Sequence, residues 1–381
     1  MTSTIQPGGT IGVLGGGQLG RMLAFAARRM GYRVHVLAPG RDNPAGQVAE
    51  MAIDAEYLPK LVETFARGVD VVTFEFENVP AEAVEAAAAS APVHPSAEVL
   101  RTTQDRGREK AFLRLGGMPA VDFDEADTAE GCRAAVEALG TPAVVKSCGF
   151  GYDGKGQAVA RTADEAADAW SAVGGGQVVV ERWLDLAMEV SVVAARSAAG
   201  EFVHYGVLEN AHERHILDLT VTDAPLSAAQ KREALEIAHA VGDGLNIVGT
   251  YCVEFFVTGD DRLLVNEIAP RPHNSGHLTI EAAATSQFEQ QLRAVCGLPL
   301  GSTEWHAPAA MANLLGDLWA DGVPAWDQAL AVPGVTLHLY GKREPRMGRK
   351  MGHLTAVGGS REEAAERVVE ARRRLAGHVV S

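Results

Sequence analysis

The first hundred residues alternate between short apolar runs and stretches in which apolar residues recur every three or four positions. The run TIGVL at 10–14 leads into GGGQLG at 15–20, and helical spacing then continues as far as Gly31. YRVHVLAP at 32–39 and DVVTFEFENVP at 70–80 have the composition of further buried strands. Because this alternation is typical of a parallel sheet with crossover helices, the sequence predicts an N-terminal α/β domain.

The pattern changes after Arg106. A helical stretch ends at Gly116 and Gly117, with Pro119 just beyond, which predicts a domain junction. The segment that follows has the pattern of a small α+β unit. Strands are predicted at 142–147, 177–184, 188–196, 249–259, 262–277 and 335–342, and Ser360 with Glu363 predicts the start of a C-terminal helix.

Length and composition place the chain among globular proteins of two or three domains. It has 381 residues, of which 47% are hydrophobic and 22% charged, and this balance excludes disordered and collagen-like chains. The formal charge of -15 would repel a polyanion, so we expect no nucleic acid partner and no membrane partner. Because the four cysteines form no CxxC pair and the chain shows neither an export signal nor a long apolar run, we expect a cytoplasmic protein.

The glycine turn at 15–20 has the spacing G-x-G-x-x-G, which occurs where a helix N-terminus holds a dinucleotide phosphate. A dinucleotide site would also need an acidic residue at the end of the second strand, but Asp42 follows only after Gly40. An NAD site is therefore the weaker interpretation. A second interpretation is that the glycines serve only close packing of strand and helix, whereas Gln18 favours contact with a small molecule.

A different apparatus for a nucleoside triphosphate lies further along the chain. Neither GKS nor GKT occurs, which excludes a Walker A loop. The glycines of GFGYDGKGQ at 149–157 let backbone amides approach phosphates, and Lys155 adds a cation. Lys146 sits inside the apolar run PAVVKS, where an unpaired ammonium is unfavourable, so we expect it to meet an anion. The alternative is a lysine that reaches solvent from an edge strand.

Two carboxylates lie on the adjacent strands predicted at 249–259 and 262–277. Glu254 and Glu267 are flanked by core residues and would repel each other unless a divalent cation lay between them. Mg²⁺ bound to triphosphate oxygens is the natural partner. Asn266 could add an oxygen if the strand is bulged there, because regular alternation would turn it to the opposite face. The alternative is a cross-strand pair with one carboxylate pointing outward.

Taken in order, the lysine-bearing strand, the glycine-rich loop, ERWL at 181–184 and the two carboxylates resemble the ATP-grasp enzymes. GGGQLGRM, TFEFENVP, GFGYDGKGQ, NEIAPRPHNSGH and GRKMGHL further resemble the N5-carboxyaminoimidazole ribonucleotide synthetases among them. The resemblance covers nearly the whole chain and implies an ATP-grasp fold, α/β with α+β in the ATP-grasp part. Three domains are implied: an N-terminal parallel-sheet pre-ATP-grasp domain that binds substrate (1–117), a small central lid with the glycine-rich loop (118–187), and a C-terminal ATP-grasp domain with metal- and phosphate-binding residues (188–381).

The same resemblance implies a ligase of de novo purine biosynthesis. ATP would phosphorylate bicarbonate to carboxyphosphate, and the exocyclic amine of 5-aminoimidazole ribonucleotide would capture the carbon dioxide released from it. The products would be N5-carboxyaminoimidazole ribonucleotide, ADP and phosphate. We accordingly expect ATP and bicarbonate as co-substrates, Mg²⁺ or alternatively Mn²⁺ as the metal, and a homodimer.

Site residues follow from the resemblance, position by position. The ATP site would comprise Arg106, Lys146, Gly151, Tyr152, Asp153, Gly154, Lys155, Gly156, Gln157, Glu181, Arg182, Trp183, Leu184, Glu189, His212, Asn266 and Glu267, and the metal ligands would be Glu254 and Glu267. The ribonucleotide would be bound by Gln18, Leu19, Lys342, Arg349 and either Glu75 or Glu77. The catalytic set would be Arg271, His273, Asn274 and Lys350 around bicarbonate and carboxyphosphate, with Tyr152, Asp153 and Lys155 closing over the substrates.

One feature agrees with this assignment independently of the resemblance. The segment 342–350 carries five lysines and arginines within an acidic chain, which is what a phosphorylated substrate needs for charge-assisted hydrogen bonds. The alternative is a solvated basic loop. Among the nearby histidines, His215 and His277 are expected to be structural.

Three other functions remain open from the residues. An ATP-grasp ligase with a different acceptor, such as a formate-using glycinamide ribonucleotide transformylase or a biotin carboxylase, would share the ATP half but not FEFEN and GRKMGH. An NAD-dependent oxidoreductase would leave Lys146, Glu254 and Glu267 unexplained. A nucleotide sensor without catalysis is disfavoured because none of the residues expected for turnover is missing.

Overall fold

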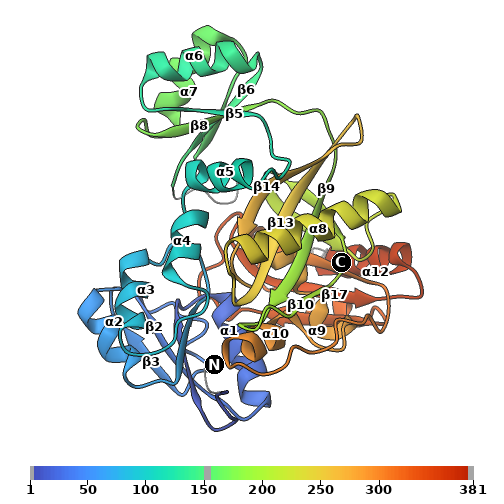
Figure 1. Ribbon diagram of the computed structural model, residues 1–381. Helices are drawn as coiled ribbons and strands as arrows, with labels where there is room; N and C mark the ends of the chain where they lie inside the picture. Colours follow the sequence, from blue (N-terminus) through green and yellow to red (C-terminus); the bar gives the residue numbers. More distant parts are fainter. Residues whose placement is uncertain (1–3, 150–155, 376–381) are drawn as a thin grey trace.

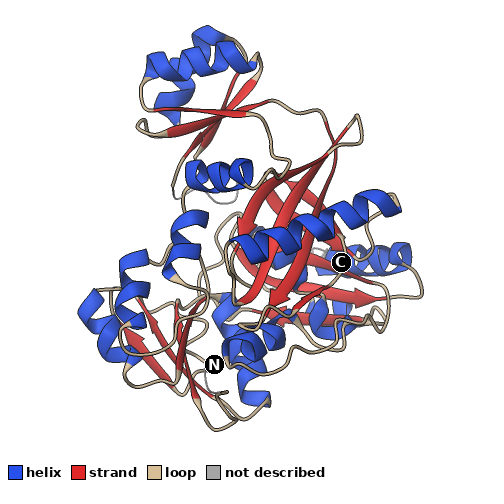
Figure 2. Cartoon of the chain, in the orientation of Figure 1, coloured by secondary structure: helices blue, strands red, loops and turns tan. Residues whose placement is uncertain are grey.

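The computed structural model describes residues 4–149 and 156–375. Within these residues the strands form three separate sheets, each with its own helices (Figures 1 and 2). In Figure 1 the N-terminal domain (blue) and the C-terminal domain (yellow to red) lie side by side, and the central domain (green) projects above them. No helix in the described part of the chain is long and apolar enough to cross a membrane.

The N-terminal domain is a parallel sheet with helices on both faces and the strand order β3-β2-β1-β4. Residues of its central strand β1 alternate between two cores, so that Ile11 and Val13 pack against α1 whereas Leu14 packs against α2 and α3. The predicted α/β class is therefore confirmed. The elements are β1 (Thr10–Leu14), α1 (Gln18–Arg29), β2 (Arg33–Ala38), β3 (Met51–Asp54), α2 (Pro59–Ala66), β4 (Val71–Phe74) and α3 (Ala81–Ala88), followed by α4 (Ala97–Thr103) and α5 (Arg106–Leu115).

The central domain is a small antiparallel sheet with the order β5-β8-β6-β7. Two helices pack on it around one apolar cluster that includes Val136, Val145 and Val178. Lys146 points away from that cluster because it is the residue after Val145 on the same strand. The elements are β5 (Phe123–Ala126), α6 (Ala129–Leu139), β6 (Ala143–Ser147), β7 (Gln157–Ala160), η1 (Ala163–Glu165), α7 (Ala166–Ala172) and β8 (Val178–Arg182).

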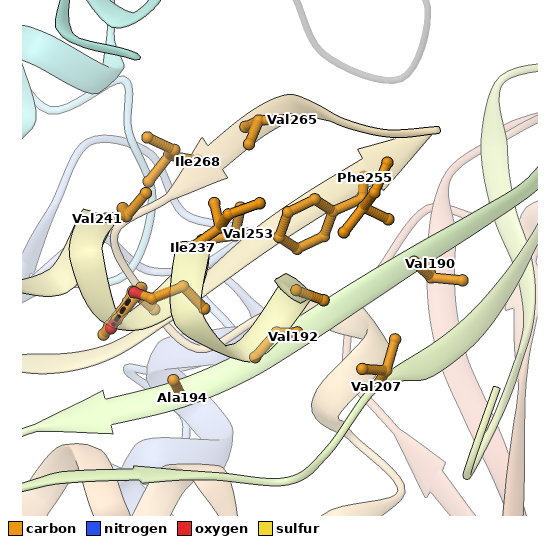
Figure 3. Close-up of a cluster of buried hydrophobic side chains, with 14 of the residues drawn as sticks. Val190, Val192, Ala194, Val207, Ile237, Val241, Val253, Phe255, Val265 and Ile268 are labelled. Atoms are coloured by element: carbon orange, nitrogen blue, oxygen red, sulfur yellow. Dashed lines mark hydrogen bonds between the residues drawn. The ribbon is translucent and has the colours of Figure 1, made fainter. Parts of the chain in front are cut away.

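The C-terminal domain is built on a long sheet with the order β14-β13-β9-β11-β12-β15-β17-β16, and β10 pairs with β9. α8 lies across β13 and β9, with Ile237 and Val241 packed against Val192, Val253 and Phe255 (Figure 3). The elements are β9 (Leu186–Arg196), β10 (Phe202–His204), β11 (Leu208–Glu213), β12 (Ile216–Val221), α8 (Ala228–Gly244), β13 (Gly249–Thr258), β14 (Leu263–Ala269), η2 (Asn274–Gly276), α9 (Thr279–Ala282), α10 (Gln287–Val295), β15 (Ala309–Leu315), η3 (Gly316–Trp319), α11 (Trp326–Leu330), β16 (Val335–Leu339), β17 (Lys350–Val357) and α12 (Arg361–Leu375).

Each strand expected from an apolar run is present, although several are shorter than the run. The run at 70–80 contains β4 only as far as Phe74, and the run at 262–277 contains β14 only as far as Ala269. Residues that line the site described below follow each strand, Glu75 and Glu77 after β4 and Arg271, His273 and Asn274 after β14. The edge strand β3 was not expected, because its side chains are mostly exposed and it is held by backbone pairing with β2.

Candidate active site

A cleft of about 1330 Å³ is lined by residues of all three domains. Gly156 belongs to the predicted ATP set but does not line it, and its carbonyl instead accepts a hydrogen bond from the Ser147 amide at 2.8 Å. The loop residues Gly151, Tyr152, Asp153, Gly154 and Lys155 lie outside the described residues. The remaining predicted site residues all line the cleft: Gln18, Leu19, Glu75, Glu77, Arg106, Lys146, Gln157, Glu181, Arg182, Trp183, Leu184, Glu189, His212, Glu254, Asn266, Glu267, Arg271, His273, Asn274, Lys342, Arg349 and Lys350.

The glycine turn before α1 binds a carboxylate of the chain itself. Glu75, directly after β4, accepts hydrogen bonds from the amides of Gly17 at 2.6 Å and Gly20 at 3.1 Å. Burial raises the pKa of Glu75, and the two amides oppose that shift by favouring its charge. Because the carboxyl group of Glu75 already occupies the amides at the helix N-terminus, the turn is not available to a dinucleotide phosphate. Gln18 and Leu19 lie at the wall of the cleft beside it.

Glu77 takes a different partner from Glu75. Its Oε1 lies 2.6 Å from Nη2 of Arg271, which follows β14, so the pair joins the N-terminal domain to the C-terminal domain. Burial acts to lower the pKa of Arg271, but Glu77 and other carboxylates outweigh burial, so the net shift is upward. The guanidinium therefore stays charged. Both glutamates line the cleft. Contact of either glutamate with a ribonucleotide stays a prediction.

On the other side of the cleft, one buried carboxylate is shared by two lysines. Glu181 Oε2 lies 2.6 Å from Lys146 Nζ and Oε1 lies 3.0 Å from Lys110 Nζ. Burial opposes the charge of Glu181, yet Lys146 and Lys110 lower its pKa to about 2. Lys146 therefore meets an anion as expected, and the three groups carry a net positive charge at the wall of the cleft. Arg106 Nη1 also reaches this region, donating to the Ser147 carbonyl at 3.1 Å.

Sequence reasoning missed Lys110, which is only 1% exposed. A signal was present, because Lys110 occupies the apolar stripe of α5, where Leu113 is also buried. A charged residue at such a position needs a buried partner. The sequence does not show that the partner is Glu181, which lies on β8 of the central sheet.

We expect Lys110→Met to lower the free energy of unfolding by about 2 kcal/mol at pH 7, below the usual cost of breaking a buried pair because Lys146 remains. The pKa of Glu181 falls from 4.5 to about 2 on folding, so its ion pairs stabilise the protein above about pH 4.5 and are lost as the pH falls toward 2. The difference in the free energy of unfolding between Lys110→Met and the wild type should therefore become smaller as the pH falls over that range. Urea unfolding between pH 7 and 3 measures it, with Lys231→Met, which disrupts a more exposed pair, as the control. A difference independent of pH would contradict the shared-carboxylate arrangement.

The two predicted metal carboxylates face each other across adjacent strands. Glu254 of β13 pairs with Glu267 of β14, and the register shifts by one residue immediately afterwards, so that Asn266 is the extra residue of a bulge. The bulge is the condition under which Asn266 can face the same cleft, and it does line the cleft. Burial and the charge of Glu267 raise the pKa of Glu254. The pair is thus electrostatically unfavourable without a cation.

These oxygens fit Mg²⁺, which prefers carboxylate and amide oxygens and keeps several positions for water and phosphate. Among the described residues, no group of three His, Cys, Asp or Glu side chains is arranged to hold a metal. Oxygens of the nucleotide and of water would complete the coordination of an ion held by Glu254 and Glu267. A further carboxyl, Glu109 of α5, is buried beside them, accepting from the Ile268 amide at 2.9 Å, and burial with Glu267 raises its pKa to about 8. Sequence reasoning did not identify Glu109.

His273 lies against the metal carboxylates. Its Nε2 is 3.3 Å from Glu254 Oε1, and its Nδ1 is 2.8 Å from the Ser275 hydroxyl. Burial, reinforced by the charges of Arg271 and Lys350, holds the pKa of His273 well below its usual value. The imidazole is therefore neutral at pH 7. Next to it, the amide of Asn274 is fixed by exchanging hydrogen bonds with the amide of Asn313.

Glu189 and His212 form another ionic pair at the cleft, with Glu189 Oε2 3.0 Å from His212 Nδ1. Burial lowers the pKa of His212, but Glu189 outweighs it and the net shift is upward. Two other histidines were expected to be structural. His277 fits that expectation, since it is 1% exposed and its Nδ1 lies 3.0 Å from Gln287 Nε2. His215 does not, because it lines the cleft and its Nδ1 lies 3.3 Å from Gln157 Nε2 of the central domain.

The basic segment contributes Lys342, Arg346, Arg349 and Lys350 to the cleft, while Arg343 is not among the described lining residues. Lys342 is held by its hydrogen bond to the Lys350 carbonyl at 2.7 Å, and burial, with the charge of Arg349, lowers its pKa to about 8. Arg349 Nη2 lies 2.7 Å from Asp42 Oδ2 of the N-terminal domain. The segment is therefore not a freely solvated loop. Asp42, considered above only in relation to NAD, instead orients an arginine.

Three segments of the chain match family profiles in chain order. Residues 9–104 match the ribonucleotide synthetase preATP-grasp domain, and residues 111–288 match the ATP-grasp domain. Residues 309–367 match the phosphoribosylaminoimidazole carboxylase C-terminal domain. Together they extend over most of the chain and confirm the predicted ATP-grasp fold.

Relatives and solved structures agree with these matches. The N5-carboxyaminoimidazole ribonucleotide synthase of Brucella melitensis biotype 1 is 43% identical over 358 residues, which cover 93% of this chain and 98% of the relative. The crystal structure of an N5-carboxyaminoimidazole ribonucleotide synthetase with ADP has a TM-score of 0.91 at 38% identity and covers 98% of each chain. The Aspergillus clavatus N5-carboxyaminoimidazole synthase, in complex with ADP and 5-aminoimidazole ribonucleotide, has a TM-score of 0.87 at 31% identity, covering 97% of this chain and 99% of that one. The chain therefore belongs to the N5-carboxyaminoimidazole ribonucleotide synthase family of ATP-grasp ligases.

Proposed function

We propose that this ligase consumes ATP and bicarbonate to carboxylate 5-aminoimidazole ribonucleotide through carboxyphosphate. The observation that carries the proposal is the continuity of the cleft. Its triphosphate side, with Lys146, Glu254 and Glu267, and its monophosphate side, with Lys342 and Arg349, line one cavity. The relative from Aspergillus clavatus holds ADP and the aminoimidazole nucleotide together in the same fold, which supports two substrate positions in this cleft.

On the ATP side, Lys146 and Arg106 would neutralise phosphate charge. Glu181 and the backbone of Trp183 and Leu184 would bind adenine, with Arg182 and Gln157 beside them, and Glu189 would accept from the ribose hydroxyls. Mg²⁺, or Mn²⁺, held by Glu254 and Glu267 would offset the charge that develops on the phosphoryl oxygens. The net positive charge of the group formed by Lys110, Lys146 and Glu181 suits a polyanion.

On the acceptor side, Lys342 and Arg349 would bind the 5'-phosphate, and Gln18, Leu19 and Glu75 or Glu77 would surround the aminoimidazole. Asp42 keeps the Arg349 guanidinium at one edge of the cleft before substrate arrives. Arginine and lysine together give a phosphate both a planar and a compact cationic partner.

The proposed reaction has three steps. A bicarbonate oxygen forms a bond to the γ-phosphorus while the bond from that phosphorus to the bridging oxygen breaks and ADP leaves. The carbon–oxygen bond of the resulting carboxyphosphate then breaks to give carbon dioxide and phosphate. The exocyclic amine adds to carbon dioxide, and its proton passes to the departing phosphate.

The chain's own residues would act by position and charge rather than as covalent nucleophiles. Arg271 and Lys350 would balance the negative charge of bicarbonate and carboxyphosphate. His273 and Asn274 are neutral groups fixed by Ser275 and Asn313, so they would orient these anions by hydrogen bonds. Tyr152, Asp153 and Lys155, together with Gly151 and Gly154, retain their predicted role of closing over the substrates. Holding the intermediate out of water protects it from hydrolysis.

We also propose domain boundaries after residues 117 and 187, a homodimer, and a cytoplasmic location. The sheets support a change of domain near each position, because β5 to β8 form the central sheet and β9 belongs to the C-terminal one. β9 begins at Leu186, so this strand starts two residues before the second proposed boundary. Light scattering coupled to size-exclusion chromatography tests the homodimer directly.

The deciding experiment measures ADP release with Mg²⁺, ATP and bicarbonate, with and without 5-aminoimidazole ribonucleotide. We expect strong stimulation by the ribonucleotide, because the acceptor side of the cleft is intact. Formation of N5-carboxyaminoimidazole ribonucleotide should match ADP release in amount. Stimulation by another amine or carboxylate in its place would instead support an ATP-grasp ligase with a different acceptor.

A further inference from the structure

The loop that carries Arg271, His273 and Asn274 is held from behind by a glutamine. Gln287, at the start of α10, is fully buried and is not one of the described residues that line the cleft. Its side chain therefore has no direct contact with a substrate in the cleft. It contacts the loop that does reach the cleft.

The Gln287 amide forms a two-point clamp on the backbone of His273. The His273 amide donates to Gln287 Oε1 at 2.8 Å, and Gln287 Nε2 donates to the His273 carbonyl at 2.7 Å. The second hydrogen of Nε2 is directed to His277 Nδ1 at 3.0 Å. Burial lowers the pKa of His277 to about 3, so its ring is neutral and this nitrogen can accept. The side chain thereby uses both donors and its acceptor, which fixes its orientation.

The rest of the turn is held against the same residue. The backbone N–H of Gln287 donates to Thr279 Oγ1 at 3.0 Å, and that hydroxyl donates to the Gly276 carbonyl at 2.6 Å. A Cβ on Gly276 would lie 2.5 Å from Gln287 Oε1. Gly276 is therefore required for the close approach of the turn to the amide, and the loop from His273 to Thr279 has one position relative to α10.

We propose that Gln287 is a positioning residue of the carboxylation reaction, which sets the His273 imidazole against Glu254 by fixing the His273 backbone. The proposal rests on the proposed role of the loop in holding bicarbonate and carboxyphosphate. Both the 3.3 Å approach of His273 to Glu254 and the placement of Asn274 depend on where this backbone lies. A displacement of about 1 Å in such a group can lower turnover by about 100-fold.

The same helix offers a matched control. Gln290 is also fully buried, and it makes the same two-point clamp on Gly301, with Nε2 2.6 Å from the carbonyl and Oε1 2.9 Å from the amide. Gly301 is not among the described residues that line the cleft. Gln287 and Gln290 therefore have equal burial and equivalent backbone bonds, but only one of them holds the reactive loop.

The test compares Gln287→Met with Gln290→Met in the full-length enzyme. Methionine keeps the volume of the side chain and removes both backbone bonds, so we expect similar losses of melting temperature. Gln287→Met should lower kcat for ribonucleotide-stimulated ADP release by about 10- to 100-fold with the KM for ATP within about twofold. Gln290→Met should leave both constants within about twofold of wild type. Equal losses of kcat in the two variants, or none in Gln287→Met, would overturn the inference.

Gly276→Ala provides a second approach that removes no polar group. Its methyl group would push against Gln287 Oε1, so kcat should fall in the same direction as in Gln287→Met even if that variant does not fold. Wild-type turnover in Gly276→Ala overturns the inference. Failure of the ribonucleotide to stimulate the wild-type enzyme would count against the proposed function instead, so the two failures are distinguishable.

Discussion

Lys350→Ala is expected to lower kcat by about 100- to 1,000-fold while the dissociation constant of ATP changes less than about threefold. Lys350 begins β17 and lines the cleft, and its charge is among those that lower the pKa of His273 and act on Glu254. The ammonium therefore lies within electrostatic range of the groups proposed to hold the reacting anions. Loss of this charge should affect carboxyphosphate, where negative charge accumulates, far more than the bound nucleotide.

Steady-state ADP release and calorimetric titration with a non-hydrolysable ATP analogue measure the two effects separately. Lys146→Ala is the reciprocal variant, and it should weaken nucleotide binding because it removes a cation from the wall of the ATP side. Lys60→Ala, an exposed lysine on α2, is the control and should change neither constant. Equal effects of Lys350→Ala and Lys146→Ala on both quantities would contradict the assignment of two separate sites.

Glu267→Gln is expected to have effects of opposite sign on activity and on stability. Turnover should fall by about 100-fold or more, with a higher Mg²⁺ concentration needed for half-maximal rate, because one of two carboxylates is lost from the metal position. The enzyme without nucleotide and metal should become more stable by about 1 kcal/mol. The reason is that Glu267 raises the pKa of both Glu254 and Glu109, so its charge is unfavourable to both in the free protein.

Differential scanning calorimetry in the presence of a chelator gives the stability change, and Mg²⁺ titration of ADP release gives the activation curve. Glu366→Gln, on the exposed face of α12, is the matched control and should leave both unchanged. A lower melting temperature together with an unaltered Mg²⁺ requirement would show that Glu267 is a structural carboxylate.

The fold was predictable from the sequence where burial produced a pattern. β1 is buried on both faces and reads as a continuous apolar run, and the helical spacing after it marks α1. The order of the long C-terminal sheet was not predictable, because β12 pairs with β15 across many intervening residues and no local pattern encodes that choice. The orientation of Asn266 depended on a one-residue shift in register, which the sequence allowed but did not establish.

The candidate site was predictable where chemistry-bearing residues stand in short motifs. The motifs did not contain the residues from elsewhere in the chain that bind and orient the motif side chains. Lys110 reaches Glu181, Asp42 reaches Arg349, and Gln287 reaches His273, each across a change of secondary-structure element. Burial of a charge or an amide predicts that a partner exists, but only the packed structure identifies it.

The carboxylate at the glycine turn bears on how such turns should be compared between relatives. Gly17 has an ordinary negative φ, so nothing in its backbone demands glycine. What excludes a side chain is Glu75, whose Oε1 would lie 2.5 Å from a Cβ at that position. Substitutions at the two positions should therefore be correlated across the family, with a residue larger than glycine at 17 tolerated only where 75 is no longer glutamate. In a dinucleotide site the same glycine would instead be required by the close approach of the bound phosphate. Its identity would then not depend on a second residue of the chain.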